Sequence, residues 1–403
     1  MIEKEEKKIT TILTTSPTPS LPSTELISSI LHSFTTHCPR LLKSPIIVVF
    51  DTTDKISANP RLKRGEASLD TGEKYALYRE NVKRLVLSCY SHCPSQENRD
   101  PQDERESQES QNYQGGTGTS ESGTTTTDTD TEVDEEEEKE DMKKWTTKAE
   151  YGLPYPTNEV ELSITQTKNG GVTFITPSTR LGFGLAVRSA LRLVQTEYVW
   201  VQQHDWVLVE DIPVADLLGV MSLSSSSSTS SSSISQETSI TGSTGSQSSE
   251  EKEVSPTEEN IPIKYITFPS IRTLTYTKQP YVLDFPLLRN YARTLTGTFT
   301  APSGAEVPLT PLFFWFDKPH IAQTKHYLER VFPNRLAMRR GEFIEDKIGQ
   351  VARGQMKEGL WERWACWLFY PEDGRKLCLR HLQGRTWRGE EGDLLRRFGY
   401  GDL

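Results

Sequence analysis

Short strand-like runs alternate with helical patterns through the first half of the chain. The strand-like runs cover residues 9–14, 45–50, 160–165, 172–176 and 198–202, whereas residues 23–39, 73–87 and 185–194 carry apolar side chains at helical spacing. The run at 45–50 is unbroken and ends in Asp51, which is typical of a buried parallel strand. This alternation predicts an α/β fold with a mostly parallel sheet and helices on both faces.

The second half is less regular. Residues 263–268 are predicted to form a strand, and residues 321–332 and 345–356 are predicted to form helices. Residues 361–370 and 376–382 flank the sequence PEDGR, which predicts a β-hairpin.

Two polar segments interrupt these patterns. Residues 95–145 end in a dense acidic block, and residues 222–260 contain a long serine run. Both compositions predict disordered insertions. Without them roughly 310 residues remain, which is within reach of one large α/β domain. We therefore expect a single interrupted domain over residues 1–403.

Composition excludes several classes of protein. The net charge of −10 and the pI of about 5.4 argue against a nucleic-acid-binding protein. No apolar run approaches the roughly 18 residues of a spanning helix, and the first residues lack a signal-peptide pattern. The five cysteines include no CxxC pair, which predicts free thiols in a reducing compartment. We expect a cytoplasmic protein that a partner could still bring to a membrane.

Parallel sheets bind ligands beyond the carboxyl ends of their strands. That rule places residues 14–17, Asp51, 178–184 and 203–206 along one edge of the predicted sheet.

Four stretches now suggest a family. They are TTILTTSPTPS at 10–20, IIVVFD at 46–51, the unit STRLGFGLAVRSAL to VWVQQHD between 178 and 205, and RRGEFIED at 339–346. In order and spacing they resemble a glycosyltransferase of the GT-A fold, most like the inverting family-two enzymes that use nucleotide-diphospho-sugars.

The resemblance implies a donor site. The loop after the first strand, with Thr15 and Ser16, would contact the nucleotide, and Asp51 would accept bonds from the base or ribose. Arg180 and Arg385 would meet the diphosphate. From the residues alone, an ordinary strand-to-helix turn explains Thr15 and Ser16 equally well, and Asp commonly opens a turn after a strand.

The resemblance also implies a Mn²⁺ or Mg²⁺ site. Family members often carry Asp-x-Asp at the end of the strand that here reads VWVQQHD, so only the last acidic position, Asp205, remains. Asp205 and the C-terminal His381 are the expected metal ligands. One carboxylate holds a hard cation weakly, so substrate phosphates would have to complete its coordination.

Asp346, with Glu345 beside it, matches the family's catalytic acids, and Asp346 would be the general base. Two acids at a helix start are also what the helix dipole favours, so capping is an open alternative. In the nearby run from Trp315 to His320, the aromatics could stack on a sugar while Asp317 or His320 bonds its hydroxyls. Core packing is the alternative there.

The expected function is therefore transfer of a sugar from a nucleotide-diphosphate donor to an unidentified glycan, protein or small-molecule acceptor, with inversion. Three alternatives stay open. They are a catalytically impaired scaffold of the same fold, a sugar nucleotidylyltransferase, whose basic glycine-rich loop is missing here, and a nucleic-acid module built on the basic C-terminal region.

Overall fold

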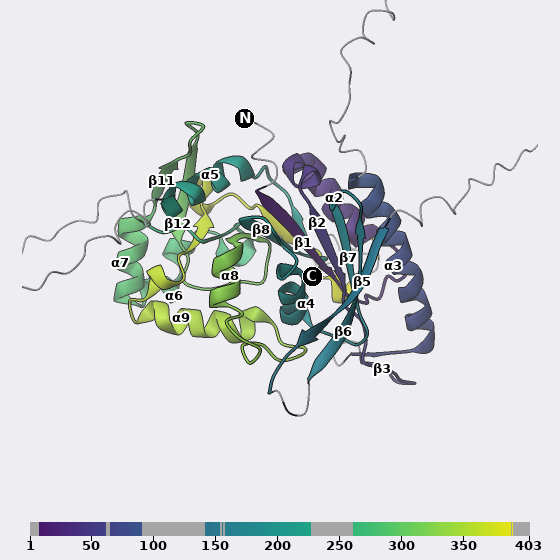
Figure 1. Ribbon diagram of the computed structural model, residues 1–403. Coiled ribbons are helices and arrows are strands. Elements are labelled where there is room, and N and C mark those ends of the chain that lie inside the picture. Colours follow the sequence, from purple (N-terminus) through teal and green to yellow (C-terminus); the bar gives the residue numbers. More distant parts are fainter. Residues whose placement is uncertain are drawn as a thin grey trace, which may run out of the picture.

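The computed structural model describes residues 8–61, 65–90, 142–153, 155, 158–226, 261–387 and 389 (Figure 1). Its main feature is one eleven-stranded sheet in the order β11-β12-β14-β10-β13-β8-β1-β2-β7-β6-β5. The strands are β1 (Ile9–Thr15), β2 (Ile46–Phe50), β5 (Met142–Glu150), β6 (Glu159–Thr167), β7 (Val172–Pro177), β8 (Tyr198–Gln203), β10 (Tyr265–Thr267), β11 (Gly297–Thr300), β12 (Glu306–Pro311), β13 (His320–Gln323) and β14 (Cys366–Phe369). The α/β class predicted from the sequence is confirmed.

The centre of the sheet is parallel. β1 pairs with β2 on one side and with β8 on the other, and β2 pairs with β7. Every residue of β1 and β2 is buried, because helices cover both faces of these strands. The carboxyl ends of β1, β2, β7 and β8 consequently meet at one edge.

The prediction of a mostly parallel sheet is wrong for the rest of the sheet, outside β1, β2, β7 and β8. Among the ten neighbouring pairs of the described sheet, only four are parallel, the three above and β10 with β14. One cause is β13, which lies antiparallel between β8 and β10, within the segment predicted to be a helix. Its four residues are too short a run to reveal a strand, and the helix of that segment, α8 (Thr324–Arg330), begins only after them.

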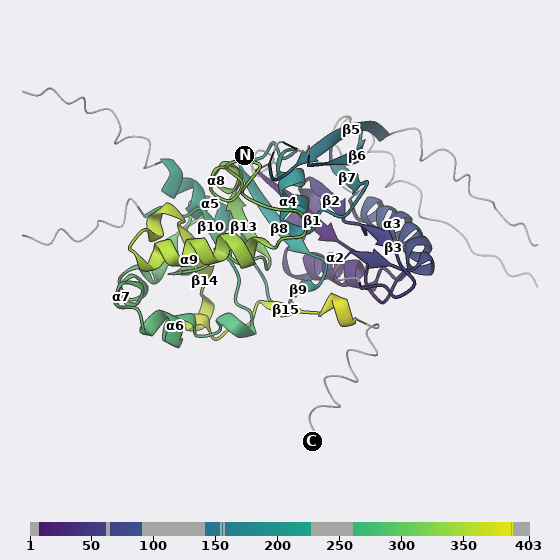
Figure 2. The same ribbon diagram turned by 90° about the horizontal axis from the view of Figure 1, so that it is seen from below.

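The helices form layers on the two faces of the sheet (Figure 2). α2 and α3 lie on one face of the central strands, and α4 and α8 lie on the other. The helices are α2 (Glu25–His37), α3 (Leu69–Tyr90), α4 (Phe183–Leu191), α5 (Val214–Ser226), α6 (Pro280–Leu283), α7 (Pro286–Leu295), α8 and α9 (Gln350–Lys357). A π-helical turn, Glu345–Gly349, leads directly into α9. None of the described helices has the length and apolar character needed to cross a membrane.

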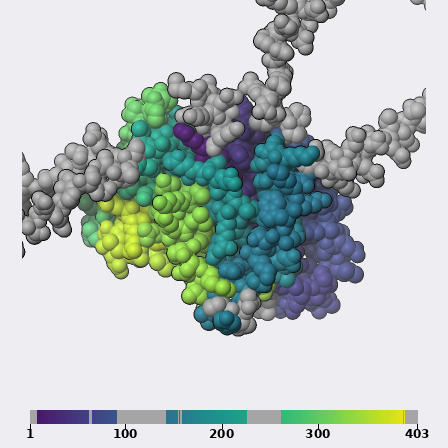
Figure 3. Space-filling model, in the orientation of Figure 1, coloured from purple at the N-terminus to yellow at the C-terminus, as the bar shows by residue number. Residues whose placement is uncertain are grey.

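One core joins the two halves of the described chain. Trp200 of β8 stacks on Phe268, which follows β10, and lies edge-on to Phe34 of α2. Figure 3 shows the C-terminal part, in green and yellow, packed directly against teal and blue elements of the first half. The described parts of the chain thus share one hydrophobic core.

The polar segments are shorter than predicted at one end each. Residues 142–145 belong to β5, which pairs with β6 and packs Trp145 against the core. Residues 222–226 complete α5, where Ser224 accepts a hydrogen bond from the Ile263 amide. Residues 95–141 and 227–260 lie outside the described part of the chain.

The predicted hairpin around PEDGR is also wrong. β14 pairs with β10 and β12, whereas β15 (Leu379–His381) pairs with β9 (Trp206–Leu208) in a separate two-stranded sheet. Glu372 and Asp373 have left-handed backbone angles, so the chain leaves the large sheet at this point instead of turning back along it.

Candidate functional site

Asp205 and His381 form an ion pair at the carboxyl end of β8. His381 Nε2 lies 3.3 Å from Asp205 Oδ2. Pairing of β9 with β15 brings them together, because it sets His381 opposite Trp206, and the Leu382 amide donates to the Asp205 carbonyl oxygen over 2.7 Å. The Asp205 side chain is 15% exposed and that of His381 is 41% exposed, so the pair is reachable from solvent.

The surroundings of the pair favour a charged carboxylate. Burial alone would raise the pKa of Asp205, but a hydrogen bond from His381, the electrostatic interactions with the His204 and His381 imidazoles and a hydrogen bond from the Gly384 amide together lower it below its usual value. Burial lowers the pKa of His204. The pair therefore holds an anionic oxygen beside an imidazole. Because His381 Nδ1 accepts a hydrogen bond from the Gln383 amide, its Nε2 carries the proton that it donates to Asp205.

The segment after β15 packs closely on this pair. A Cβ atom on Gly384 would lie 2.9 Å from His204 Nε2 and 3.0 Å from Asp205 Cβ, so glycine permits the approach. The next residue, Arg385, places its guanidinium 5.6 Å from the ring centre of Phe343. Neither Gly384 nor Phe343 was singled out in the sequence, because nothing in a local pattern shows that these segments meet.

Phe343 connects this segment to the loop before α4. Its ring stacks on Phe183 with centres 6.1 Å apart. Gly182 has a φ of 79°, and a Cβ there would lie 2.4 Å from the Cα of Gly341. The RRGEFIED stretch, the RLGFG loop and Arg385 thus adjoin one another.

Asp51 has a structural task at this edge. Its carboxylate accepts hydrogen bonds from the amides of Leu181 (2.6 Å), Gly182 (2.9 Å) and Thr52 (3.0 Å), and only 7% of the residue is exposed. Burial outweighs these bonds and raises the pKa of Asp51. The turn-forming alternative therefore explains the position better than direct contact with a nucleotide.

Thr15 is likewise turned inward. It is 1% exposed, and its hydroxyl lies 2.7 Å from the Tyr78 hydroxyl. Ser16, the next residue, is partly exposed at the same edge. Of the two expected loop contacts, only Ser16 is accessible.

Arg180 lies between the loop after β2 and the RRGEFIED stretch. Its carbonyl oxygen accepts a bond from Arg340, which also pairs with Asp54. The Arg180 guanidinium makes no hydrogen bond to another described residue, and it lies near Gly341. It is thus one of the cationic groups at this edge that could meet an anion.

Asp346 is exposed, whereas Glu345 is largely held by the protein. Asp346 lines an open pocket of about 560 Å³ together with Arg339, Gly341, Glu342, Phe343 and Lys347. Glu345 accepts a hydrogen bond from the Asp317 amide, and burial raises its pKa. Of the two expected catalytic acids, Asp346 is the accessible one, and the start of the π-helical turn sets its position.

The Trp315–His320 run is core. Trp315 and His320 are fully buried, and Asp317 uses its carboxylate to accept the Glu345 amide. Lys318 is also buried and donates to Phe268 O, Ser270 Oγ and Thr273 Oγ1. The expectation that aromatics of this run stack on a sugar is therefore wrong for Trp315, because core packing encloses it.

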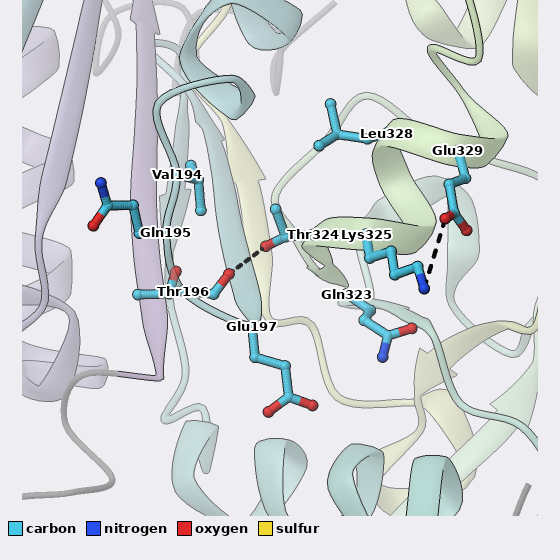
Figure 4. A pocket seen from close by; sticks show the side chains of 9 residues that line it. All are labelled: Val194, Gln195, Thr196, Glu197, Gln323, Thr324, Lys325, Leu328 and Glu329. Carbon is cyan, nitrogen blue, oxygen red and sulfur yellow. Dashed lines mark hydrogen bonds and ion pairs between the residues drawn. The ribbon is translucent and has the colours of Figure 1, made fainter. Parts of the chain in front are cut away.

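A larger pocket of about 610 Å³ lies at the other edge of the sheet (Figure 4). It sits where β8 begins, between the loop at 194–197 and α8, and Thr324 Oγ1 closes its floor by donating to the Thr196 carbonyl oxygen over 2.9 Å. This is the amino end of the parallel strands, where α/β sheets do not usually bind ligands. Asp51, His204 and Asp205, whose pKa values are shifted, lie at the opposite edge.

The carboxyl edge thus holds an anionic oxygen and an imidazole in one pair, two arginines, and an exposed carboxylate beside an open pocket. Among the described residues no group of three or more His, Cys, Asp or Glu side chains could hold a metal. A scan against models of known protein families finds no match for this chain, and a search of curated proteins finds none either.

Proposed function

We propose that the chain is a glycosyltransferase that moves a sugar from a nucleotide-diphosphate donor to an acceptor hydroxyl. The observation that carries this proposal is the Asp205–His381 pair at the end of β8, with the segment bearing Arg385 packed against it. A carboxylate, an imidazole and a guanidinium at a strand end suit a diphosphate together with its cation.

The pair fits a divalent cation. Two neighbouring ligands of a six-coordinate Mn²⁺ or Mg²⁺, each about 2.1 Å from the ion, lie about 3 Å apart. The 3.3 Å between Asp205 Oδ2 and His381 Nε2 is close to that spacing, and the ion would replace the proton that Nε2 now donates to Asp205. Asp205 and His381 would hold the ion, and donor phosphates and water would complete its coordination. A bound cation would stabilise the charge that the departing diphosphate acquires.

The donor would lie along the edge from Ser16 to Arg385. Arg180 and Arg385 would bind the phosphates, with Phe343 holding the Arg385 guanidinium in place through its ring. Asp51 would act indirectly, because its carboxylate fixes the amides of Leu181 and Gly182 and so sets the loop that carries Arg180.

Asp346 would be the general base. It would take the proton of the acceptor hydroxyl while the acceptor oxygen forms its bond to the anomeric carbon. The bond from that carbon to the donor phosphate oxygen breaks, and its electron pair leaves with the nucleotide diphosphate. Attack from the face opposite the leaving group inverts the anomeric centre. The open pocket beside Asp346 offers room for the acceptor.

A second candidate is a donor-binding protein of the same architecture without transferase activity. One observation favours it: Gln203 and His204 precede Asp205, so the strand end supplies a single carboxylate. Such a protein would bind a nucleotide sugar and leave it intact.

Calorimetry tests the proposal. The intact chain is titrated with a panel of nucleotide-diphospho-sugars, with and without Mn²⁺, and compared with Asp205→Asn. The matched control is Asp211→Asn, because Asp211 also pairs with a histidine, His37, but does so on an exposed surface away from the site. We expect cation-dependent binding that Asp205→Asn weakens at least tenfold and that Asp211→Asn leaves unchanged.

A second measurement separates the two candidates. With a donor that binds, Asp346→Asn should keep its affinity and lose donor hydrolysis and transfer. Binding without turnover in the wild type would select the second candidate. Absence of binding to every donor by a folded protein would overturn both.

A further inference from the structure

α6, α7 and α9 lie side by side at the end of the molecule opposite α3 (Figures 1 and 2). Three leucines of this region are exposed: Leu283 (40%), Leu287 (49%) and Leu360 (43%). Tyr281, Phe285 and Tyr291 surround them and are only partly buried. We call these six residues the leucine surface.

The segments that carry the leucine surface contact one another. Leu287 Cδ1 approaches to 4.0 Å of the point where Gly359 would carry a Cβ, which places it beside Leu360. Tyr291 donates from its hydroxyl to the Gly359 carbonyl oxygen over 3.0 Å, and Arg289 donates to the Leu283 carbonyl oxygen over 3.3 Å. Segments of α6, α7 and the end of α9 thus contribute to one exposed patch.

Basic side chains lie among the apolar ones. Lys357 Nζ is 3.9 Å from the ring centre of Phe285, and the Arg353 guanidinium is 5.7 Å from that of Tyr281. Residues 271–295 and 350–363 contain seven Arg and Lys and three Asp and Glu, namely Asp284, Glu358 and Glu362. These two stretches of sequence are therefore together positive by 4 charges in a chain whose net charge is −10.

This combination suits one kind of partner. Exposed leucines and half-buried aromatics can enter the boundary between lipid headgroups and acyl chains, while Arg and Lys reach the phosphates. A second copy of the chain fits less well, because a symmetric contact would set the same positive surface against itself. We propose that the leucine surface docks this protein reversibly onto membranes that contain anionic lipid.

Vesicle flotation with the intact protein tests the proposal. The probes are phosphatidylcholine vesicles with and without phosphatidylserine. We expect the wild type to float with the anionic vesicles only, and raised salt should weaken this binding because it screens the charges. The double variant Leu283→Glu/Leu287→Glu should lose about tenfold or more of the binding.

A matched control is available on α3. Leu69 and Leu77 are also exposed leucines, and α3 lies at the other end of the molecule. Leu69→Glu/Leu77→Glu adds the same charge and should bind vesicles as the wild type does. Arg289→Glu/Arg293→Glu provides a second test that removes no apolar contact, and it should also weaken binding.

Three outcomes would overturn the proposal. One is absence of vesicle binding by a folded wild type, and another is equal loss in both leucine double variants. The third is a dimer in light scattering that Leu283→Glu/Leu287→Glu dissociates while vesicle binding is absent, which would assign the surface to a second copy of the chain.

Discussion

Asp317 and Glu345 hold each other through a reciprocal pair of hydrogen bonds. The Glu345 amide donates to Asp317 Oδ1 over 3.0 Å, and the Asp317 amide donates to Glu345 Oε2 over 3.3 Å. Burial, reinforced by the charges of Glu345 and Asp346, raises the pKa of Asp317 well above its usual value. Asp317 therefore fixes the start of the helix that carries Asp346, although its own charge is unfavourable there.

Two substitutions of Asp317 separate the contribution of its hydrogen bonds to stability from that of its charge. Asp317→Ala leaves a buried amide without its acceptor and should lower the free energy of unfolding by about 2 kcal/mol. Asp317→Asn keeps an acceptor oxygen and removes the charge, so it should be at least as stable as the wild type at pH 7. Urea denaturation followed by tryptophan fluorescence measures both, and equal losses would contradict this account.

The difference in stability between Asp317→Asn and the wild type should depend on pH in one direction. Because the folded-state pKa of Asp317 is raised, the stability it contributes is present at low pH and is lost as the pH rises through that pKa. The free energy of unfolding of Asp317→Asn should therefore increase relative to that of the wild type between about pH 4 and pH 7.

Lys318 gives a second pH-dependent prediction. Burial lowers the pKa of Lys318 to about 7, although its ammonium group donates hydrogen bonds to three oxygen atoms. Between this pKa and the ordinary lysine value the unfolded chain binds a proton that the folded chain has released, so stability should rise with pH by up to about 1.4 kcal/mol per unit. Lys318→Met should lack this rise between pH 7 and 9.

Lys325→Met is the control for this measurement. Lys325 is an exposed lysine on α8 that pairs with Glu329. This variant should follow the wild-type stability across the same pH range, and a wild-type slope retained in Lys318→Met would refute the assignment to Lys318.

The central strands could be predicted because their surroundings leave a local signature. β1, β2 and β8 are almost entirely buried, so each appears as a short run of apolar or β-branched residues, and in β2 the run is unbroken and apolar. β13 and β15 have four and three residues, and their pairing is decided by strands distant in the sequence. No local pattern can reveal such pairing, and for this reason the mixed half of the sheet and the hairpin were predicted wrongly.

The candidate site, too, could be predicted only in part from the sequence. Asp205 and Asp346 were proposed from the sequence because a polar strand end and an acidic helix start resemble the motifs of a known family. The contact of Asp205 with His381 depends on the β9–β15 pairing, which was not predicted. The inward orientation of Thr15 and Asp51 depends on Tyr78 and on the amides of Leu181 and Gly182, which come from other segments.

We expect Gly384 to be essential to the Asp205–His381 pair but not to the fold. Gly384→Ala would force a methyl group against His204 and Asp205 and displace the segment that carries Arg385. We expect cation-dependent donor binding to fall about tenfold or more while the unfolding free energy changes by less than about 1.5 kcal/mol. Gly354→Ala, at an open position in α9, should leave binding unchanged and stabilise slightly.

Gly182 should instead matter to the fold itself. Its φ of 79° disfavours any side chain, and a Cβ would lie 2.4 Å from a backbone atom of Gly341, which cannot rotate away as a side chain could. Gly170 has a similar φ of 73° but no atom within 4 Å of the added Cβ, so a substitution there measures the backbone strain alone. Gly170→Ala should cost about 1 kcal/mol in urea denaturation, and Gly182→Ala should cost about 2 kcal/mol more, because only there must two loops separate. Equal costs would mean that the loop before α4 and the RRGEFIED stretch are not in contact, and the edge described here would lose its connection to Asp346.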